Sequence, residues 1–101
     1  MVVEFLSFKV PADERDRWLD MDAEHWTAFL EQRPGFIRKE VWVDAEDPEA
    51  VTAVIWWRTL EEWRSIPQEE LDAVIERMGP FERTARLTTF DVVRTATESP
   101  K

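Results

Sequence analysis

The chain has 101 residues, 44% of them hydrophobic and only two glycine, which predicts one compact globular domain, residues 1–94, followed by a short tail, residues 95–101. A formal net charge of −9 repels phosphate backbones and anionic membrane surfaces, and the absence of cysteine excludes disulfides and thiolate chemistry. No apolar run approaches the roughly 18 residues of a membrane helix, and the N-terminus lacks a signal-peptide pattern. We therefore expect a cytoplasmic protein without nucleic-acid or membrane partners.

Residues 2–10, VVEFLSFKV, are rich in β-branched and aromatic side chains and predict a first strand with bulky residues on both faces. Pro11 suits the first turn of a helix, because its missing N–H is one of the donors that stay unpaired there, and Pro34-Gly35 ends the helix after about Arg33. At 100° per residue, one stripe of this helix carries Trp18, Met21, His25 and Phe29. It is flanked by a second set, Asp22, Trp26 and Leu30. We expect the first stripe to face the core.

Three further strands are predicted at residues 36–44, 50–58 and 85–94, and a second helical segment lies before the last of them. The order strand, helix, strand, strand, helix, strand is that of a ferredoxin-like α+β fold. Right-handed crossovers place both helices on one face of a four-stranded antiparallel sheet. The other face of the sheet then has no cover from its own chain.

The second helical segment is predicted to consist of two pieces. Thr59 and Glu62 fit a capping box, in which each side chain satisfies a free backbone donor, and Ser65 and Gln68 repeat the pattern around Pro67. The buried stripe and the end of the second piece are expected at Leu71, Val74, Ile75, Met78 and Gly79-Pro80.

Trp56 and Trp57 are neighbours on the third strand, so their side chains point to opposite faces of the sheet. We expect one indole to face the helices and the other to lie on the bare face with Val54, Leu6 and Phe8. An uncovered Trp alone exposes about 150–250 Å², worth roughly 4–6 kcal/mol as an upper bound. A second copy packed sheet against sheet would cover this face, so the sequence predicts a homodimer.

A further pair of charges lies on the second strand. Arg38 and Glu40 are expected on the same face as Phe36 and Trp42, because all four occupy alternate positions. Opposite charges placed in this way could pair across the dimer.

The order of elements, the PGF turn after the first helix, the KEVW strand and the segment WRTLEEW resemble the dimeric α+β barrel superfamily of antibiotic biosynthesis monooxygenase-like proteins. The resemblance covers about residues 2–94. Within it, residues 34–71 are similar to an uncharacterised family of small, mainly cyanobacterial proteins. The superfamily includes oxygenases, haem-degrading enzymes, isomerases and proteins without known activity, so the resemblance implies the fold more strongly than a reaction.

The haem-degrading branch of this superfamily has a pattern of three residues, an Asn on the first strand, a Trp at the end of the third strand and a His on the second helix. Trp57 matches the Trp of its pattern, but the sequence contains no Asn, and residues 59–84 contain no His to match the other two positions. The resemblance therefore does not imply haem degradation, and no cofactor is expected.

The candidate site residues are mostly on the first helix. Asp22 and His25 are three residues apart, so the carboxylate could orient the imidazole as a general base, or the two could form an ordinary local pair at the helix edge. Trp18, Trp26, Phe29 and Trp57 could line an aromatic cavity between the helix and the sheet and bind a ligand there together with His25, or they could simply form core. One His and neighbouring acids supply too few converging ligands for a metal, so none is expected.

Three functions remain open from the sequence. The first is a homodimeric barrel of unknown function that binds a small apolar or aromatic molecule. The second is a cofactor-independent monooxygenase or isomerase, with His25 as base, Asp22 orienting it and Trp57 stacking on the substrate. The third is a structural or interaction module without a ligand. Whether the chain is an enzyme is left undecided.

Overall fold

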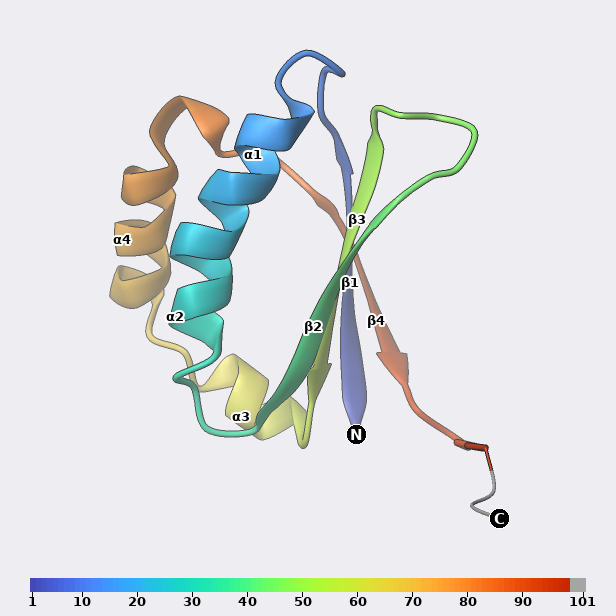
Figure 1. Ribbon diagram of the computed structural model, residues 1–101. Coiled ribbons are helices and arrows are strands. Elements are labelled where there is room, and N and C mark those ends of the chain that lie inside the picture. Colours follow the sequence, from blue (N-terminus) through green and yellow to red (C-terminus); the bar gives the residue numbers. More distant parts are fainter. Residues whose placement is uncertain (99–101) are drawn as a thin grey trace.

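The computed structural model describes residues 1–98, which form one antiparallel sheet and one layer of helices (Figure 1). The elements are β1 (Val2–Lys9), α1 (Arg15–Met21), the π-helix η1 (Asp22–Thr27), α2 (Ala28–Leu30), β2 (Phe36–Val43), β3 (Ala50–Trp57), α3 (Leu60–Arg64), α4 (Gln68–Met78), the 3-10 turn η2 (Gly79–Phe81) and β4 (Arg86–Asp91). The sheet order is β2-β3-β1-β4, with every neighbouring pair antiparallel. The predicted ferredoxin-like α+β fold is confirmed.

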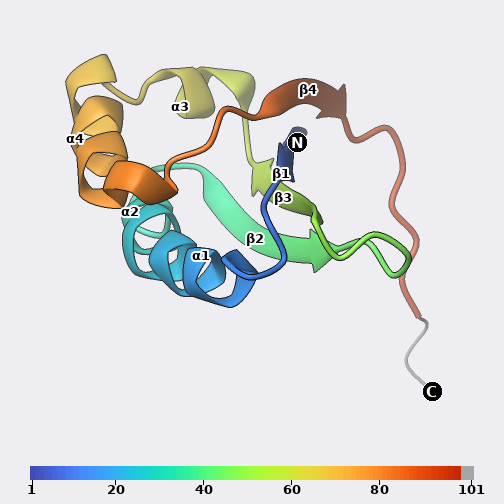
Figure 2. The same cartoon turned by 90° about the horizontal axis from the view of Figure 1, so that it is seen from above.

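The helices cover only one face of the sheet. Figure 1 shows α1, α2 and α4 on the same side of the strands, and the view from above in Figure 2 agrees. Trp57, which is fully buried, and Ile55 pack with Leu30 of α2 on this side. The prediction that one of the paired indoles faces the helices is therefore confirmed, and it is Trp57.

The assignment of Leu6 and Phe8 to the bare face is wrong. Both side chains line the space between β1 and the helices, because Glu4, Leu6 and Phe8 alternate onto the inner face. Alternation shows which residues share a face but not which face is the inner one, and both sides of β1 carry bulky residues.

The outer face carries a different set of aromatic residues. Phe5 pairs with Val54 across β1 and β3, and its ring makes edge contacts with Trp42 and Phe90, at centroid distances of 6.2 and 5.8 Å. Trp56 lies on the same face, because it alternates with Val54 along β3. Among residues 1–98, no helix lies over this face of the sheet in Figures 1 and 2.

The predicted alternation of β2 is wrong at its start, because a β-bulge lies between Phe36 and Arg38. Phe36 pairs with Trp57 and stacks edge-on against it on the inner face, whereas Arg38 pairs with Trp56 and places its guanidinium 4.0 Å from that indole's centroid. The extra residue reverses the face between the two positions, so Phe36 does not share the face of Arg38. Arg38 pairs with Glu40 of its own strand, at 3.3 Å, and pairing of these charges across a dimer stays a prediction.

The helix predicted to run to about Arg33 is divided by a π-helical turn. Within η1 the hydrogen bonds reach one residue further back, as in the bond from the Ala28 N–H to the Ala23 carbonyl. The last turn of the helix, α2, ends at Leu30. The chain then turns through Gly35, whose φ of 83° suits glycine.

The break in the second helical segment is confirmed as α3 and α4. Thr59 caps α3 as predicted, because its hydroxyl accepts a bond from the Glu62 N–H at 3.1 Å. The second capping box is wrong: α4 begins after Pro67, and the Ser65 hydroxyl donates instead to the Glu62 carbonyl. Of the expected stripe on α4, Val74 and Met78 are buried, but Ile75 is 40% exposed.

The described part of the predicted tail is residues 95–98. Residues 95–98 form no helix or strand, and residues 99–101 lie outside the described part of the chain. In residues 1–98, no helix has the length and apolar character that crossing a membrane requires.

Candidate ligand-binding cavity

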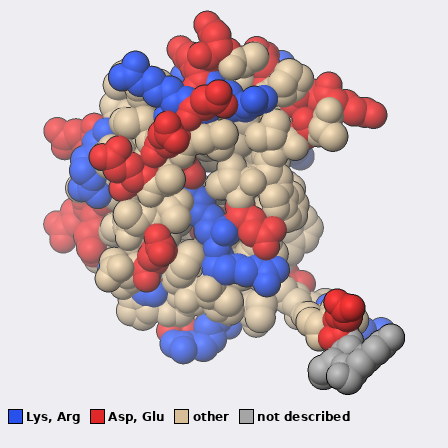
Figure 3. Space-filling model, in the orientation of Figure 1, with Lys and Arg blue, Asp and Glu red and all other residues tan. Residues whose placement is uncertain are grey.

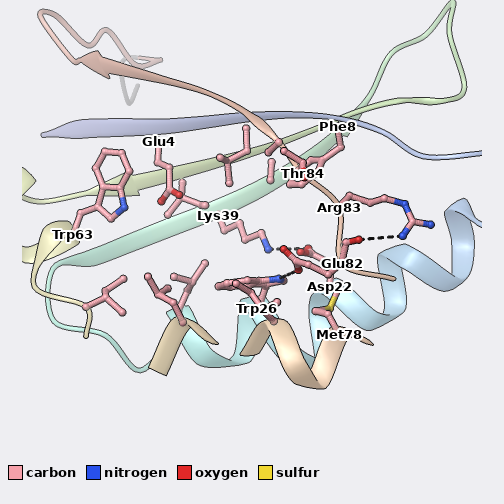
Figure 4. Close-up of a pocket in the computed structure, with 18 of the residues that line it drawn as sticks. Glu4, Phe8, Asp22, Trp26, Lys39, Trp63, Met78, Glu82, Arg83 and Thr84 are labelled. Carbon is pink, nitrogen blue, oxygen red and sulfur yellow. Dashed lines mark hydrogen bonds and ion pairs between the residues drawn. The ribbon is translucent and has the colours of Figure 1, made fainter. Parts of the chain in front are cut away.

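A cavity of about 530 Å³ lies between the helices and the inner face of the sheet. Its walls are mainly apolar and come from β1, β3, η1, α3 and α4, where they include Leu6, Phe8, Ala53, Ile55, Trp26, Trp63, Leu71, Ile75 and Met78. This volume lies in the range of pockets that hold small molecules. Figure 4 shows that polar groups also reach the cavity, from both of its ends.

The π-helix determines which side chains of the first helix face this cavity. The lining residues recur at intervals of four, as Trp18, Asp22, Trp26 and Leu30. On a regular α-helix this spacing drifts steadily around the axis, but the wider turn of η1 reduces the drift and keeps the four residues on one side. The stripe expected at Met21, His25 and Phe29 assumed an unbroken α-helix and is absent from the cavity wall.

The centre of the cavity wall holds a buried ion pair. The Lys39 ammonium lies 2.7 Å from Asp22 Oδ2 and donates a second bond to the Thr27 hydroxyl at 2.9 Å. The two charged side chains are only 4% and 6% exposed. Buried charges are rare unless they are paired, and their desolvation is costly, so a pair beside an open cavity is a candidate functional group.

Lys39 was not identified from the sequence. It pairs with Ile55 on the inner face of β2, one residue away from the exposed Arg38. The sequence feature that indicates it is a lysine at an alternate position between Ile37 and Val41, on a face of β2 whose other residues toward the C-terminal end are apolar. The bulge lies before Arg38, so the alternation from Arg38 to Val43 is regular and places Lys39 on the same face as Val41 and Val43.

A second acidic group lies near the ion pair, in the connection between α4 and β4. Glu82 accepts a hydrogen bond from the Trp26 indole at 2.9 Å (Figure 4), and the neighbouring Arg83 turns away to Glu14, at 2.6 Å. Burial raises the pKa of Glu82, the bond from Trp26 opposes this, and the charge of Asp22 raises it further. This carboxyl therefore takes up a proton more readily than an exposed glutamate.

Glu4 supplies a third carboxyl, from β1. Its Oε1 accepts a hydrogen bond from the Trp57 indole at 3.1 Å. Burial raises the pKa of Glu4, while the bond from Trp57 and the charge of Lys39 act in the opposite direction. Trp57 itself lies behind Glu4 and outside the cavity wall.

A pH titration of stability tests the environment of Glu4. Because its pKa is raised in the folded state, the folded chain holds this proton more tightly, and Glu4 makes stability fall as pH rises from 4.5 through the raised value. Glu4→Gln has no such proton and should gain stability over the wild type across that window, reaching a plateau above it. Urea unfolding between pH 4 and 8 measures the difference.

Glu61→Gln, at an exposed position of α3, removes one carboxylate elsewhere and serves as the control. A Glu4→Gln curve parallel to that of the wild type at all pH values would contradict the prediction.

The structure brings together three of the six residues predicted for the site. Trp18, Asp22 and Trp26 line the cavity, whereas His25, Phe29 and Trp57 do not. Asp22 is paired with Lys39 rather than with His25, which is half-buried at the edge of η1. A base role for His25 thus has no support from this cavity.

Metal binding has no obvious place in this site. Across residues 1–98, His, Asp and Glu side chains form no group of three or more that could hold a metal ion. Acidic and basic groups are instead interspersed over the helices, and further basic groups lie over β2 (Figure 3).

The single helix layer, the antiparallel sheet and the cavity between them define a ferredoxin-like α+β protein with an internal site of ligand size. Residues 1–77 match the family model for antibiotic biosynthesis monooxygenases. The chain therefore belongs to the antibiotic biosynthesis monooxygenase family, as the resemblance predicted. The matched range contains Glu4, Asp22 and Lys39 and ends within α4, before Glu82.

Solved structures of similar fold include three with described ligands or activities. A cofactor-independent oxygenase from Streptomyces nogalater is 18% identical, with a TM-score of 0.70 and coverage of 96% of this chain and 97% of the other. A Streptomyces coelicolor monooxygenase in complex with nanaomycin D is 14% identical, with a TM-score of 0.74 and coverage of 97% and 92%. A heme-degrading protein from Mycobacterium tuberculosis, with two hemes bound, is 22% identical, with a TM-score of 0.67 and coverage of 96% and 100%.

These identities establish a shared fold and no more. No match was found among the curated proteins. The similarity to small, mainly cyanobacterial proteins stays a prediction. Heme does not fit the residues present, because the cavity wall contains no His and the chain has neither Cys nor Tyr to bind its iron.

Proposed function

We propose that the chain is a cofactor-independent monooxygenase that oxidises a small hydroxylated aromatic molecule in this cavity. The observation that carries the proposal is the buried Asp22–Lys39 pair in the wall of an otherwise apolar cavity of about 530 Å³. Membership of the monooxygenase family and the fold shared with a cofactor-independent oxygenase support it. A cavity left open between core layers also favours ligand binding over a purely structural role.

The polar groups suggest how the substrate is activated. The Lys39 ammonium makes two bonds, to Asp22 and Thr27, and has a third N–H that could donate to a substrate oxygen. A fixed ammonium in a weakly solvated cavity stabilises the negative charge that forms when an aromatic hydroxyl loses its proton. Glu82 is the better candidate for the base, because its raised pKa lies closer to neutrality than that of a free glutamate.

The deprotonated ring can donate electrons to molecular oxygen. One oxygen atom of O₂ bonds to a ring carbon that carried hydrogen, and the other leaves as water. That water takes the hydrogen of the ring carbon and the hydrogen of the hydroxyl, so a phenol and O₂ give a quinone and water. The apolar wall holds the ring in place and limits access of bulk water to the reacting carbon.

Oxygen uptake with naphthols and hydroxyanthracenes tests this function. The wild type should consume one O₂ per quinone formed, and Lys39→Met should lower kcat/KM by about 100-fold or more, the usual loss when a charge-stabilising donor is removed. Lys9→Met, an exposed lysine at the end of β1, removes the same charge away from the cavity and should have no effect. Both rates are followed with an oxygen electrode.

Ligand binding without oxidation is the second candidate. It is favoured by the pairing of Lys39 with Asp22, which partly neutralises the ammonium. Tight binding of these compounds without oxygen uptake would support binding alone and reject the monooxygenase.

We also propose that a second copy of the chain covers the outer face of the sheet. Trp42 and Phe90 are 45% and 49% exposed there and flank the ring of Phe5. Soluble monomers seldom leave such an aromatic patch in water. An isologous contact through this patch would bury it on both chains and leave the cavity, on the opposite face, free.

A further inference from the structure

We infer that Glu4 is a specificity-determining residue that accepts a hydrogen bond from the ligand, so that the cavity selects aromatic molecules carrying a hydroxyl or ammonium group and rejects carboxylates. This inference rests on the proposed function only in that a small aromatic molecule occupies the cavity. It concerns the charge of that molecule and does not require its oxidation.

Glu4 is placed for this role by its strand. It lies on the inner face of β1, between Ile55 of β3 and Thr89 of β4, and Figure 4 shows its carboxyl turned into the cavity near Trp63. The Trp57 indole fixes one oxygen at 3.1 Å. The second oxygen has no hydrogen-bond partner within residues 1–98, so it is the carboxyl atom that a ligand can reach.

The end of the cavity near Glu4 differs from the end near the ion pair. Figure 4 shows Asp22, Glu82 and Trp26 together on the far side of Lys39, while Glu4 stands apart beside Trp63. A ligand anchored at Lys39 would therefore present another part of its ring system to Glu4. Lys39 and Glu4 would therefore bind different groups of the same molecule.

The charges around the cavity disfavour an anionic ligand. Three carboxyls and one ammonium line the interior, and the ammonium is already paired with Asp22. Arg83 also lines the wall, but its guanidinium is bound to Glu14 and to the Pro80 carbonyl. The remaining charged residue is Arg64, which is exposed on α3. The charged groups that line the cavity are thus Glu4, Asp22, Lys39, Arg64, Glu82 and Arg83.

A ligand carboxylate near Glu4 would lie beside a second carboxyl, and the charge of the nearest ammonium, Lys39, is already paired with Asp22. Like charges in a weakly solvated site repel strongly. A hydroxyl can donate to the free Glu4 oxygen, and an ammonium can form a charge-assisted bond there, which is shorter and stronger than a neutral one. Selection therefore follows from which groups can donate to Glu4.

Three probes of equal ring size test this inference: 2-naphthalenemethanol, 2-(aminomethyl)naphthalene and 2-naphthoate. Isothermal titration calorimetry at pH 7 should show that naphthoate binds at least 10-fold more weakly than either of the other two, which corresponds to about 1.4 kcal/mol. Glu4→Gln should weaken binding of the amine by about 10-fold. The ratio of the affinity for the alcohol to the affinity for naphthoate should also be at least threefold smaller in Glu4→Gln than in the wild type.

Glu61→Gln removes an exposed carboxylate of α3 and should leave all three affinities unchanged. Equal binding of naphthoate and the alcohol by the wild type would overturn the inference, as would unchanged ratios in Glu4→Gln or no binding of any probe. Binding that follows the expected order without oxygen uptake from naphthols would reject the monooxygenase and keep the role of Glu4.

Discussion

Asp22→Ala should lower the free energy of unfolding by about 3–5 kcal/mol, because it leaves the Lys39 ammonium buried without a counter-charge. The wild-type pair is almost fully buried, and the remaining partner of the ammonium, the Thr27 hydroxyl, is neutral. Such a loss exceeds the effect of most single substitutions. Urea unfolding followed by tryptophan fluorescence measures it.

The double variant Asp22→Leu with Lys39→Met is the matched control. Replacing both charges by apolar groups of similar size is often neutral or stabilising, so the double variant should recover to within about 1 kcal/mol of the wild type or exceed it. The same folded variant should lose oxygen uptake about 100-fold, which separates the role of the charges in function from their role in stability. A loss below about 1 kcal/mol in Asp22→Ala would show that the ammonium reaches water or another partner.

The second large effect concerns the outer face of the sheet. Light scattering after size exclusion should give 24.0 kDa for the wild type, twice the 12.0 kDa of one chain. Trp42→Glu combined with Phe90→Glu places two like charges on each chain where the apolar rings would meet, so the dissociation constant should rise by at least 100-fold and the chain should elute as a monomer.

Leu87→Glu provides a control on the same strand as Phe90. Leu87 pairs with Leu6 on the inner face and is 52% exposed, so the variant introduces a similar charge at similar exposure on the opposite side of the sheet. It should remain a dimer. A wild-type mass of one chain at micromolar concentration would contradict the proposed assembly.

The order of elements could be predicted from the sequence because strong local signals mark it. Each of these signals depends only on residues that are close along the chain. Examples are the cap at Thr59, the break at Pro67 and the turn at Gly35. The inward position of Leu6 could not be predicted, because both faces of β1 are apolar and alternation does not say which one meets the helices. Only the tertiary packing decides it.

The candidate site was harder to predict, for two physical reasons. A π-helical turn and a β-bulge each change the phase of an element by one residue, and periodic patterns assume that phase. The sequence also favours partners that are close along the chain. It paired Asp22 with His25, three residues away, whereas the actual partner, Lys39, lies 17 residues away on another element.

The π-helical turn absorbs one residue without changing which side of the helix faces the cavity. At 100° per residue, an unbroken α-helix would carry Trp26 and Leu30 about 80° and 120° around the axis from Trp18, so the wide turn of η1 returns both residues to the cavity side. Loss of one residue from the exposed stretch at Ala23 and Glu24 would let the turn close into a regular α-helix and would leave Trp26 and Leu30 within about 20° of Trp18. A relative that is one residue shorter at this point can therefore have a regular first helix and still present the same wall to its ligand.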